Sequence, residues 1–383
     1  MHALRWIPLF AALAALPASA GTPAEAANLQ REFTVANEAW TLKLKVAASP
    51  EAQRDAWKAR PDAAVYGKRM WNQLRSSLNE EWMLEPAAWL LRIAPSAVET
   101  QPDGSAKPVL ADAVTAIREA VEKNHLRSGK LAPLCMALAA GHDPSALSLL
   151  EKIESANPDP KIQGVAALAQ AILLKNLGDE GDVMRRRLTL IRKAIINSAD
   201  IEIDGTTVAK IAEDELYIIR YLTKGRVAPD LSGTDSGGRP LKLSDYQGKT
   251  VILLFWGSDI AEFDRTIDMV AGWTKKFEGK PVAIIGVNND PLETLRNLQA
   301  NGRVTWPNFT DNTNRLAADY RVGVRPLVYV LDGERKIRYL GAPGSFVELT
   351  AEAVLAESAA PAAPAAPAAP AAPAAPAAPA TGK

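Results

Sequence analysis

The sequence predicts an α + α/β protein, in which a helical-hairpin domain precedes an α/β domain with a mixed sheet. Two observations carry this prediction. From about residue 30 to residue 223, apolar residues recur at intervals of three and four, the spacing that buries one face of a helix. From residue 228 to about residue 355, short apolar runs alternate with amphipathic ones, as strands and helices do in α/β proteins. We therefore expect folded domains at residues 30–225 and 226–355.

In the first domain, breakers such as Pro86, Gly141 and Gly178 separate the helical segments, which favours packed helical hairpins. Residues 149–196 resemble a tetratricopeptide-like hairpin pair, but the Trp-x-x-Leu-Gly signature and a fixed period are missing. A degenerate hairpin domain is therefore favoured over a regular solenoid. The most periodic segments are residues 63–78, 109–121, 146–153, 165–174 and 183–196.

In the second domain, residues 250–256 form a short apolar run that begins with β-branched residues, as a buried strand does. Asp332-Gly333 is a turn dipeptide between two apolar-rich flanks and predicts a hairpin into residues 336–340. The remaining expected elements are strands at residues 282–287 and 327–331 and helices at residues 262–277 and 292–298.

Composition excludes several classes of protein. The 383 residues include 44 Lys+Arg and 44 Asp+Glu, so the chain lacks the basic excess of a general nucleic-acid binder. Hydrophobic residues make up 48% and charged residues 23%, which is typical of a globular protein. Three histidines and one cysteine leave little material for a zinc site, an iron–sulfur cluster or disulfides. We expect no metal and no cofactor.

Residues 1–20 have the anatomy of a secretory signal peptide: Arg5, an apolar run over residues 6–16, and Ala18-Ser19-Ala20 as a cleavage site. The apolar run is short for a transmembrane anchor, and no cysteine follows it for lipid attachment. We expect an exported protein of the periplasm, envelope or extracellular space, without an integral membrane segment after cleavage. Thiols tend to be oxidised there.

The tail, residues 359–383, carries proline at every third position from Pro361 to Pro379 with alanine between. This spacing favours extended polyproline II, which at about 3.1 Å per residue could reach roughly 65 Å. A solubility segment, a wall-spanning stalk and a specific ligand segment remain open as roles. We expect none in catalysis, since the tail carries no reactive side chain.

Several motifs of the second domain resemble thioredoxin-like redoxins of the AhpC/TSA and TlpA type. These are Ala-Pro-Asp-Leu at residues 228–231, the loop of residues 241–249, Phe-Trp-Gly-Ser at residues 255–258, residues 282–290, and Tyr-Arg-Val-Gly-Val-Arg-Pro at residues 320–326. The resemblance covers about 125 residues and implies a thioredoxin-like fold. The activities it implies are thiol-disulfide exchange or peroxide reduction.

The catalytic cysteines of that family are absent. The positions of its Cys-x-x-Cys motif hold Ile260, Ala261, Glu262 and Phe263. The motif normally sits at a helix N-terminus, where the helix dipole and free amides lower the pKa of the first thiol. Cys135 lies in the other domain within an apolar run, and we expect it to be a small buried hydrophobe. The sequence therefore assigns no catalytic residue.

Asp259-Ile260-Ala261-Glu262 has the spacing of a capping box, with an acceptor at the N-cap and a Glu three residues later. We expect Asp259 and Glu262 to satisfy the amides of the helix start in place of the sulfur. The resemblance also implies that Pro326 is cis, beside a peptide groove formed with Trp256. Arg325 is bulky for that groove, so an ion pair with Asp259 or Glu262 is an equal alternative.

The remaining candidates are weaker. His125 and His142 have no second ligand at metal spacing. The tryptophans of the first third of the chain are expected in the core because aromatic rings gain much from burial. They are Trp40, Trp57, Trp71, Trp82 and Trp89.

The function that these observations favour is a redox-inactive binding or scaffold module that meets a protein partner through the helical domain or the redoxin groove. Two alternatives stay open. The first is a thiol-disulfide or antioxidant enzyme, as the family resemblance implies. The second is a non-redox enzyme built around Asp259, Glu262 and Arg325.

Overall fold

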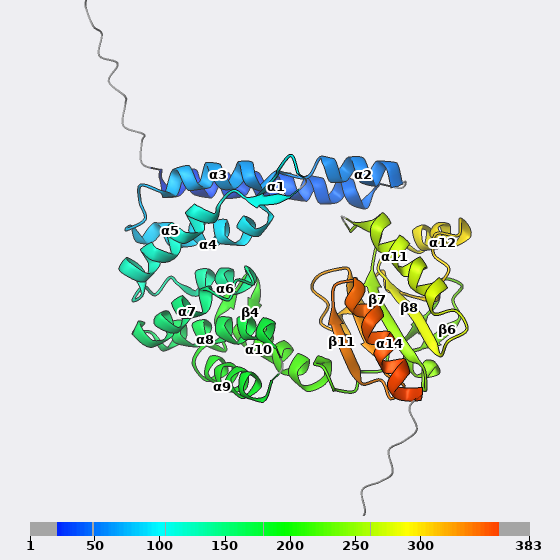
Figure 1. The fold of residues 1–383 in the computed structure, drawn as a ribbon. Coiled ribbons are helices and arrows are strands. Elements are labelled where there is room, and N and C mark those ends of the chain that lie inside the picture. Colours follow the sequence, from blue (N-terminus) through cyan, green and yellow to red (C-terminus); the bar gives the residue numbers. More distant parts are fainter. Residues whose placement is uncertain (1–20, 48–49, 104, 179, 261, 360–383) are drawn as a thin grey trace, which may run out of the picture.

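The computed structural model describes residues 21–47, 50–103, 105–178, 180–260 and 262–359. The predicted signal peptide and residues 360–383 of the tail lie outside the described residues. The described chain forms two domains. The helical one arches from the C-terminal domain and returns to meet it again (Figure 1).

Helical structure begins at Pro23, earlier than residue 30. Thr22 caps the first helix with a capping box: its hydroxyl accepts from the Glu25 amide at 3.2 Å, and Glu25 accepts from the Thr22 amide at 2.9 Å. The helices of the domain are α1 (Pro23–Lys45), α2 (Pro50–Lys58), α3 (Ala63–Leu74), α4 (Leu84–Ile93), α5 (Ala111–Ala120), α6 (Ala132–Ala140), α7 (Ala146–Ala156), α8 (Pro160–Leu174), α9 (Gly181–Ser198) and α10 (Val208–Tyr217).

Short elements connect these helices. The antiparallel pairs are β1 (Val98–Thr100) with β2 (Ala106–Pro108) and β3 (Glu202–Ile203) with β4 (Thr206–Thr207). One π-helical turn, Val121–His125, follows α5, and another, Ile218–Leu222, follows α10. The five helical segments predicted from periodicity correspond to α3, α5, α7, α8 and α9.

Successive helices pack as hairpins, most closely in the series α7, α8 and α9. The middle helix α8 is buried on most of its residues because it lies between its two neighbours. In α1 only Ala26 and Leu29 are buried. The rest of α1 and α2 form a two-helix arm that projects from the domain core toward the C-terminal domain (Figure 1).

The C-terminal domain is an α/β fold with a five-stranded sheet in the order β11-β10-β7-β8-β9. β7 runs parallel to β8 and antiparallel to β10, so the sheet is mixed as predicted. Its strands are β7 (Thr250–Trp256), β8 (Val282–Asn288), β9 (Asn308–Thr310), β10 (Leu327–Leu331) and β11 (Ile337–Gly341), and β5 (Ser232–Thr234) pairs with β6 (Pro240–Lys242) apart from them. Its helices are α11 (Phe263–Lys276), α12 (Leu292–Ala300), α13 (Arg315–Asp319) and α14 (Ser345–Ala359).

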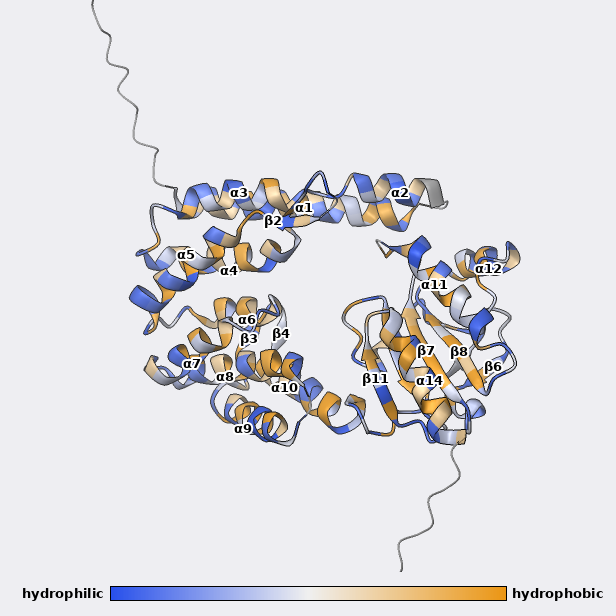
Figure 2. Ribbon diagram, in the orientation of Figure 1, coloured by the Kyte–Doolittle hydropathy of each residue, from blue (hydrophilic) through white to orange (hydrophobic). Residues whose placement is uncertain are grey.

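β7 divides the core of this domain into two layers, because alternate side chains of a strand point to opposite faces. Ile252, Leu254 and Trp256 pack with residues of α11, α12 and α14. Val251, Leu253 and Phe255 pack on the other face, in a cluster that includes Ile218 and Leu222 of the second π-helical turn. The central strand β7 and its parallel neighbour β8 are accordingly mostly hydrophobic (Figure 2).

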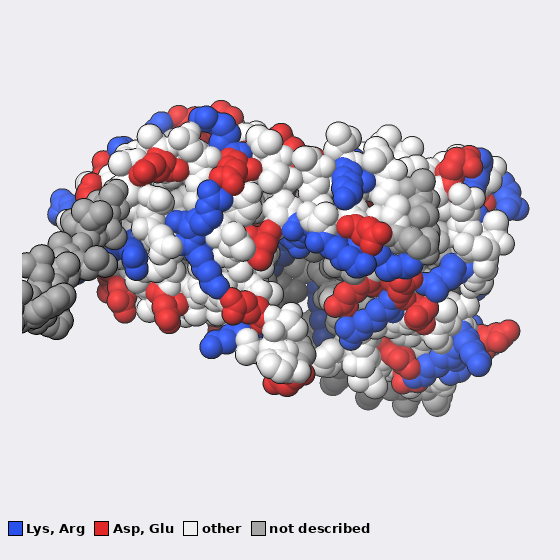
Figure 3. Space-filling view, turned by 90° about the horizontal axis from the view of Figure 1, so that it is seen from above, with Lys and Arg blue, Asp and Glu red and all other residues white. Residues whose placement is uncertain are grey.

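The two domains meet at both ends of the helical arch. At the chain connection, Arg321 forms an ion pair with Asp214 at 2.6 Å and lies 4.1 Å from the centre of the Tyr217 ring. At the other end, α2 contacts the turn between β7 and α11. Figure 3 shows acidic and basic side chains interspersed on the face it presents, without a large area of one sign.

Candidate functional site at the turn between β7 and α11

The chain leaves β7 at Trp256 and passes through a turn before α11 begins at Phe263. Gly257 allows a close approach at the start of this turn, because a Cβ atom there would collide with the side-chain oxygen of Asn289. Asp290, just beyond the end of β8, holds the next residue. It accepts from the Ser258 amide at 2.9 Å, from the Ser258 hydroxyl at 2.7 Å and from Asn288 Nδ2 at 2.7 Å.

Burial raises the pKa of the Asp290 carboxyl above its ordinary value, and the hydrogen bonds from Asn288 and Ser258 oppose that rise. The same carboxyl is 7% exposed. We did not predict this network from the sequence, although residues 282–290 were part of the family resemblance. The sequence feature that could have indicated the network is an Asp two residues after the end of a buried strand. β7 and β8 are parallel, so this Asp and the turn after β7 lie at the same end of the sheet.

The predicted capping box is wrong. The N-cap of α11 is Glu262, and no side chain caps the helix. Asp259 lies four residues before the first helical residue, too far for its carboxylate to serve the N2 or N3 amides. The cause lies outside the segment: Asp290 accepts from the Ser258 amide, and residues 258–260 and 262 are in turn or bend conformation. The Glu262 carboxylate instead accepts from Arg265 at 3.1 Å, and both side chains are exposed.

The two positions that carry cysteine in the family are apolar and packed. Ile260 is 7% exposed. The Phe263 ring stacks on Trp256, with ring centroids 6.3 Å apart and planes inclined by 22°. Trp256 is fully buried, and its indole N–H donates to Asn308 Oδ1 at 2.9 Å. Trp256 therefore belongs to the core beneath the turn and does not line a surface groove.

The Arg325–Pro326 peptide bond is cis, as the resemblance implied. Leu327 pairs with Phe255 across β10 and β7, so Pro326 lies beside the end of β7 and the start of the turn. The alternative of an ion pair between Arg325 and Asp259 or Glu262 is wrong. Arg325 Nη2 donates to Asn314 Oδ1 at 2.6 Å, and its Nε is buried without a partner.

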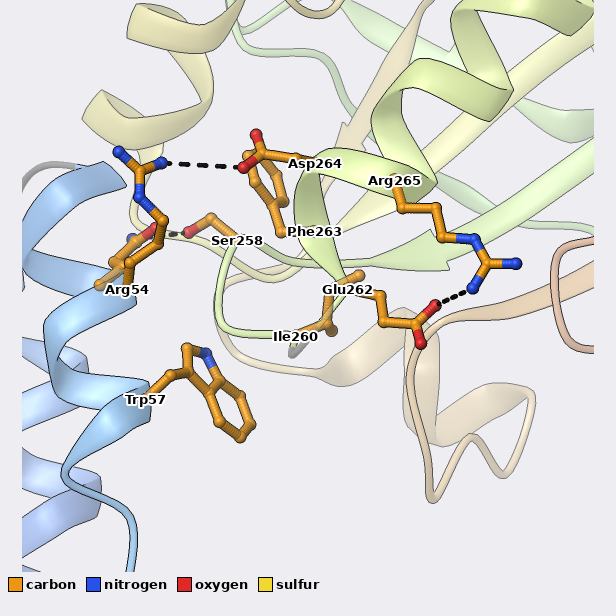
Figure 4. A pocket seen from close by; sticks show the side chains of 9 residues that line it. Arg54, Trp57, Ser258, Ile260, Glu262, Phe263, Asp264 and Arg265 are labelled. Atoms are coloured by element: carbon orange, nitrogen blue, oxygen red, sulfur yellow. Dashed lines mark hydrogen bonds and ion pairs between the residues drawn. The ribbon is translucent and has the colours of Figure 1, made fainter. Parts of the chain in front are cut away.

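A cavity of about 380 Å³ lies between the turn and α2 of the helical domain (Figure 4). Gln53 Nε2 donates to Ser258 Oγ at 3.1 Å, and Arg54 lies 3.7 Å from the Asp264 carboxylate. Trp57 and Ile260 face each other across the cavity (Figure 4). The helical domain thus covers the turn that carries the cysteine pair in the family, a contact that we did not predict from the sequence.

Trp57 also shows that the tryptophans play different roles. Trp71, Trp82 and Trp89 are partly buried against the helical core, as expected. Trp40 and Trp57 lie outside that core and form an edge-to-face pair 5.1 Å apart in the two-helix arm. The Trp40 indole donates to the Ala56 carbonyl at 2.8 Å, whereas the Trp57 indole N–H is buried without a partner.

The other singled-out residues lie in the helical domain. Cys135 is fully buried on α6, and burial raises the pKa of its thiol to about 12. His125 is buried and donates from Nε2 to the Leu78 carbonyl at 2.8 Å. His142 is exposed and lies 3.0 Å from Asn176 Nδ2. Within the described residues, no group of three or more His, Cys, Asp or Glu side chains is placed to hold a metal ion.

A sequence model described as the AhpC/TSA family matches residues 224–340. The C-terminal domain is a thioredoxin-like redoxin. The redoxin domain has the cis-proline that the resemblance implied, and its sequence lacks the Cys-x-x-Cys motif. It is a thioredoxin-like domain of the thiol-disulfide oxidoreductase type.

The chain is 27% identical over 117 residues to the thiol-disulfide oxidoreductase ResA of Geobacillus kaustophilus, a match that covers 30% of this chain and 67% of ResA. It is 27% identical over 124 residues to the protein DipZ of Mycobacterium tuberculosis, covering 30% of this chain but 18% of DipZ. Among solved structures, the thioredoxin domain of a thiol-disulfide oxidoreductase from Bacteroides vulgatus matches with 23% identity and a TM-score of 0.33, over 35% of this chain and 98% of that domain.

Between residues 21 and 359, leaving aside the positions that are not described, no helix is long and apolar enough to cross a membrane. The family match lies in the redoxin domain, and each of the two relatives covers 30% of the chain. The family match therefore bears on the redoxin domain alone.

Proposed function

We propose that this is an exported, redox-inactive binding protein in which the redoxin domain serves as a docking platform. The observation that carries the proposal is the pair of apolar side chains at the family's cysteine positions. Ile260 is packed against the turn, and Phe263 is stacked on Trp256. Thiol-disulfide exchange requires a thiolate that attacks a disulfide sulfur, and this turn supplies no sulfur.

Cys135 does not replace the missing pair. Its thiol is fully buried on α6, and a pKa of about 12 keeps it protonated at neutral pH. It also lies in the helical domain, outside the turn that binds α2. A reactive thiol is normally partly exposed in an electropositive site, and the surroundings of Cys135 are the apolar helical core.

The contact with α2 supports the role of a platform. Ser258 of the turn accepts a hydrogen bond from Gln53, and Asp264 in the first turn of α11 forms an ion pair with Arg54. The turn thus binds a helix of the same chain in place of a substrate. A helical-hairpin domain held in this way can present its outer surface to another protein.

Export is a part of the proposal that rests on the sequence of residues 1–20. N-terminal sequencing of the protein recovered from the envelope fraction tests it. A mature chain that begins at Gly21 is the expected result. A chain that still starts at Met1 and is found in the cytoplasmic fraction would contradict export.

The redox part is tested with reduction of insulin by dithiothreitol and with consumption of peroxide. The wild-type protein and the C135S variant are expected to show no turnover above the uncatalysed reaction. The double variant I260C/F263C restores both sulfurs at the family positions and serves as the positive comparison. Turnover by the wild-type protein that persists in C135S would favour the alternative hypothesis, that the protein is a thiol-disulfide oxidoreductase.

A further inference from the structure

The outer face of α9 exposes an apolar groove that the redoxin domain does not cover. Leu188, Ile195 and Ile196 are 41%, 36% and 73% exposed. With Leu216 of α10 they line a groove of about 600 Å³. α9 lies at the outer end of the series α7, α8 and α9 (Figure 1). A contiguous exposed apolar surface with a polar rim is typical of a protein interaction site.

The rim of the groove is basic. Its lining includes Arg185 and Arg192 and no carboxylate. Arg192 is exposed and forms no ion pair or hydrogen bond with any part of the chain that the structure describes. Arg185 pairs with Asp182, but both side chains are largely exposed, at 75% and 91%, and such a pair contributes little. Both arginines are therefore available to a partner's carboxylates.

The spacing of these residues follows one face of the helix. Arg185, Leu188, Arg192 and Ile195 recur at intervals of three, four and three residues. The two arginines are seven residues apart, which corresponds to about 10.5 Å along the helix axis. A partner helix with acidic residues at the same interval can meet both cations while its apolar residues enter the groove between them.

The packing of the domain indicates how such a helix would bind. α8 packs on α7 and α9 packs on α8, each through an apolar face. The inner face of α9 is buried through residues that include Leu190, Ile191 and Ala194. α10 also packs on α9, and its Leu216 forms one wall of the groove. The apolar side chains between that wall and the exposed face of α9 leave a position where one more helix can pack.

We propose that the groove on α9 binds an acidic amphipathic helix of a partner protein. This proposal deepens the proposed binding function, on which it rests, by naming the surface and the chemistry of the partner. The partner helix carries apolar residues at intervals of three and four and carboxylates seven residues apart. The charge on the rim is what selects an acidic helix over a neutral one.

The test is fluorescence anisotropy with the full-length protein and a labelled helical peptide of about 18 residues, long enough for several turns. The peptide has Leu on one face and Glu at the flanking positions, and a second peptide has Lys in place of every Glu. The wild-type protein is expected to bind the Glu peptide and to bind the Lys peptide at least about tenfold more weakly. The variant R192E should reverse this preference.

Ile196→Glu places a charge in the groove and is expected to weaken binding of the Glu peptide about tenfold or more. Leu349→Glu is the matched control, because Leu349 of α14 is also exposed, at 58%, and lies in the other domain. Its binding should equal that of the wild-type protein. Both substituted side chains are exposed, so both variants should keep the wild-type circular dichroism spectrum.

Two results would overturn the proposal. One is a wild-type protein that binds neither peptide, or binds both with the same affinity. The other is self-association in sedimentation experiments that I196E abolishes, because a second copy of the chain would then occupy the groove. Neither readout involves redox turnover. Insulin reduction by the wild-type protein would therefore contradict the proposed redox inactivity. It would not change the conclusion about peptide binding in the groove.

Discussion

Ile260 and Phe263 show how much of this site is decided by two side chains. The cis bond before Pro326 that the family resemblance implied is present beside the end of β7. The chemistry of the turn differs because both reactive positions hold hydrocarbon side chains. Asp290, which holds the turn through Ser258, remains as a buried carboxyl beneath it.

The Asp290 carboxyl predicts a pH dependence of stability. Because its pKa in the folded protein lies above that of the unfolded chain, the native state holds an additional proton between the two values. Its contribution to the free energy of unfolding is therefore lost as the pH rises through that window, by about 1.4 kcal/mol per unit of pKa difference. The D290N variant lacks this loss.

Urea unfolding at several pH values from about 4 to about 7 measures the effect. The free energy of unfolding of D290N minus that of the wild-type protein is expected to increase with pH. The level of that difference also reflects the altered hydrogen bond from Asn288, so the slope is the quantity to compare. Parallel curves for the two proteins would contradict the prediction.

Cys135 gives a second prediction at this scale. Its buried thiol, with a pKa of about 12, should not react with Ellman's reagent at about pH 8 while the protein is folded. One thiol per chain should react after denaturation in guanidinium chloride, since the sequence has a single cysteine. Rapid labelling of the native protein would mean that α6 opens or that the thiol is activated.

At the scale of elements, the central strands were predictable from the sequence. The predicted strands at residues 250–256 and 327–331 have the bounds of β7 and β10. Both are short apolar runs buried on two faces, and such runs carry their signal within the strand itself. The start of α11 was not predictable in the same way. The acceptor that sets the turn is Asp290, which lies 32 residues from Ser258 in sequence.

The packing of α8 on α9 predicts the effect of a single methyl group. Gly164 of α8 faces α9, where an added Cβ atom would collide with the Ser198 hydroxyl and lie 2.9 Å from the Asn197 Cβ atom. The G164A variant is expected to be less stable by about 1–3 kcal/mol. Gly272 of α11 has open space around a Cβ atom, so G272A should be more stable by about 0.5–1 kcal/mol.

Thermal or urea unfolding of the two variants beside the wild-type protein measures both effects. The pair is informative because the substitution and the helical context are the same and only the neighbours differ. A G164A protein as stable as G272A would mean that α8 and α9 are farther apart in solution.

At the scale of the molecule, the contact between α2 and the redoxin turn is what the sequence could not show. It includes a hydrogen bond between Gln53 and Ser258, which are 205 residues apart, and an ion pair between the exposed side chains of Arg54 and Asp264. Contacts of this kind leave no periodicity in the sequence. Trp40 and Trp57 were expected in the domain core but lie in the two-helix arm. The sequence indicates that an aromatic ring gains free energy from burial, but the place where it is buried depends on the fold.

This contact predicts a change of shape. The triple variant Q53A/R54A/W57A removes three side chains of α2 that line the cavity at the turn. The radius of gyration from small-angle X-ray scattering is expected to rise, because the arm loses one of the two attachments of the helical arch. The circular dichroism spectrum should change little, since these side chains lie outside both domain cores.

Lys58→Ala is the matched control, because Lys58 also lies on α2 but pairs with Asp55 of its own helix. It should leave the scattering curve unchanged. An unchanged curve for the triple variant as well would show that the arch stays closed without these side chains.

The covalent connection between the domains favours the contact between α2 and the turn. A few polar contacts between separate molecules would bind weakly, but a tethered segment meets its site at an effective concentration that the connecting chain sets, whatever the concentration of the protein. Any free ligand of the turn would have to displace α2 before it could occupy that surface.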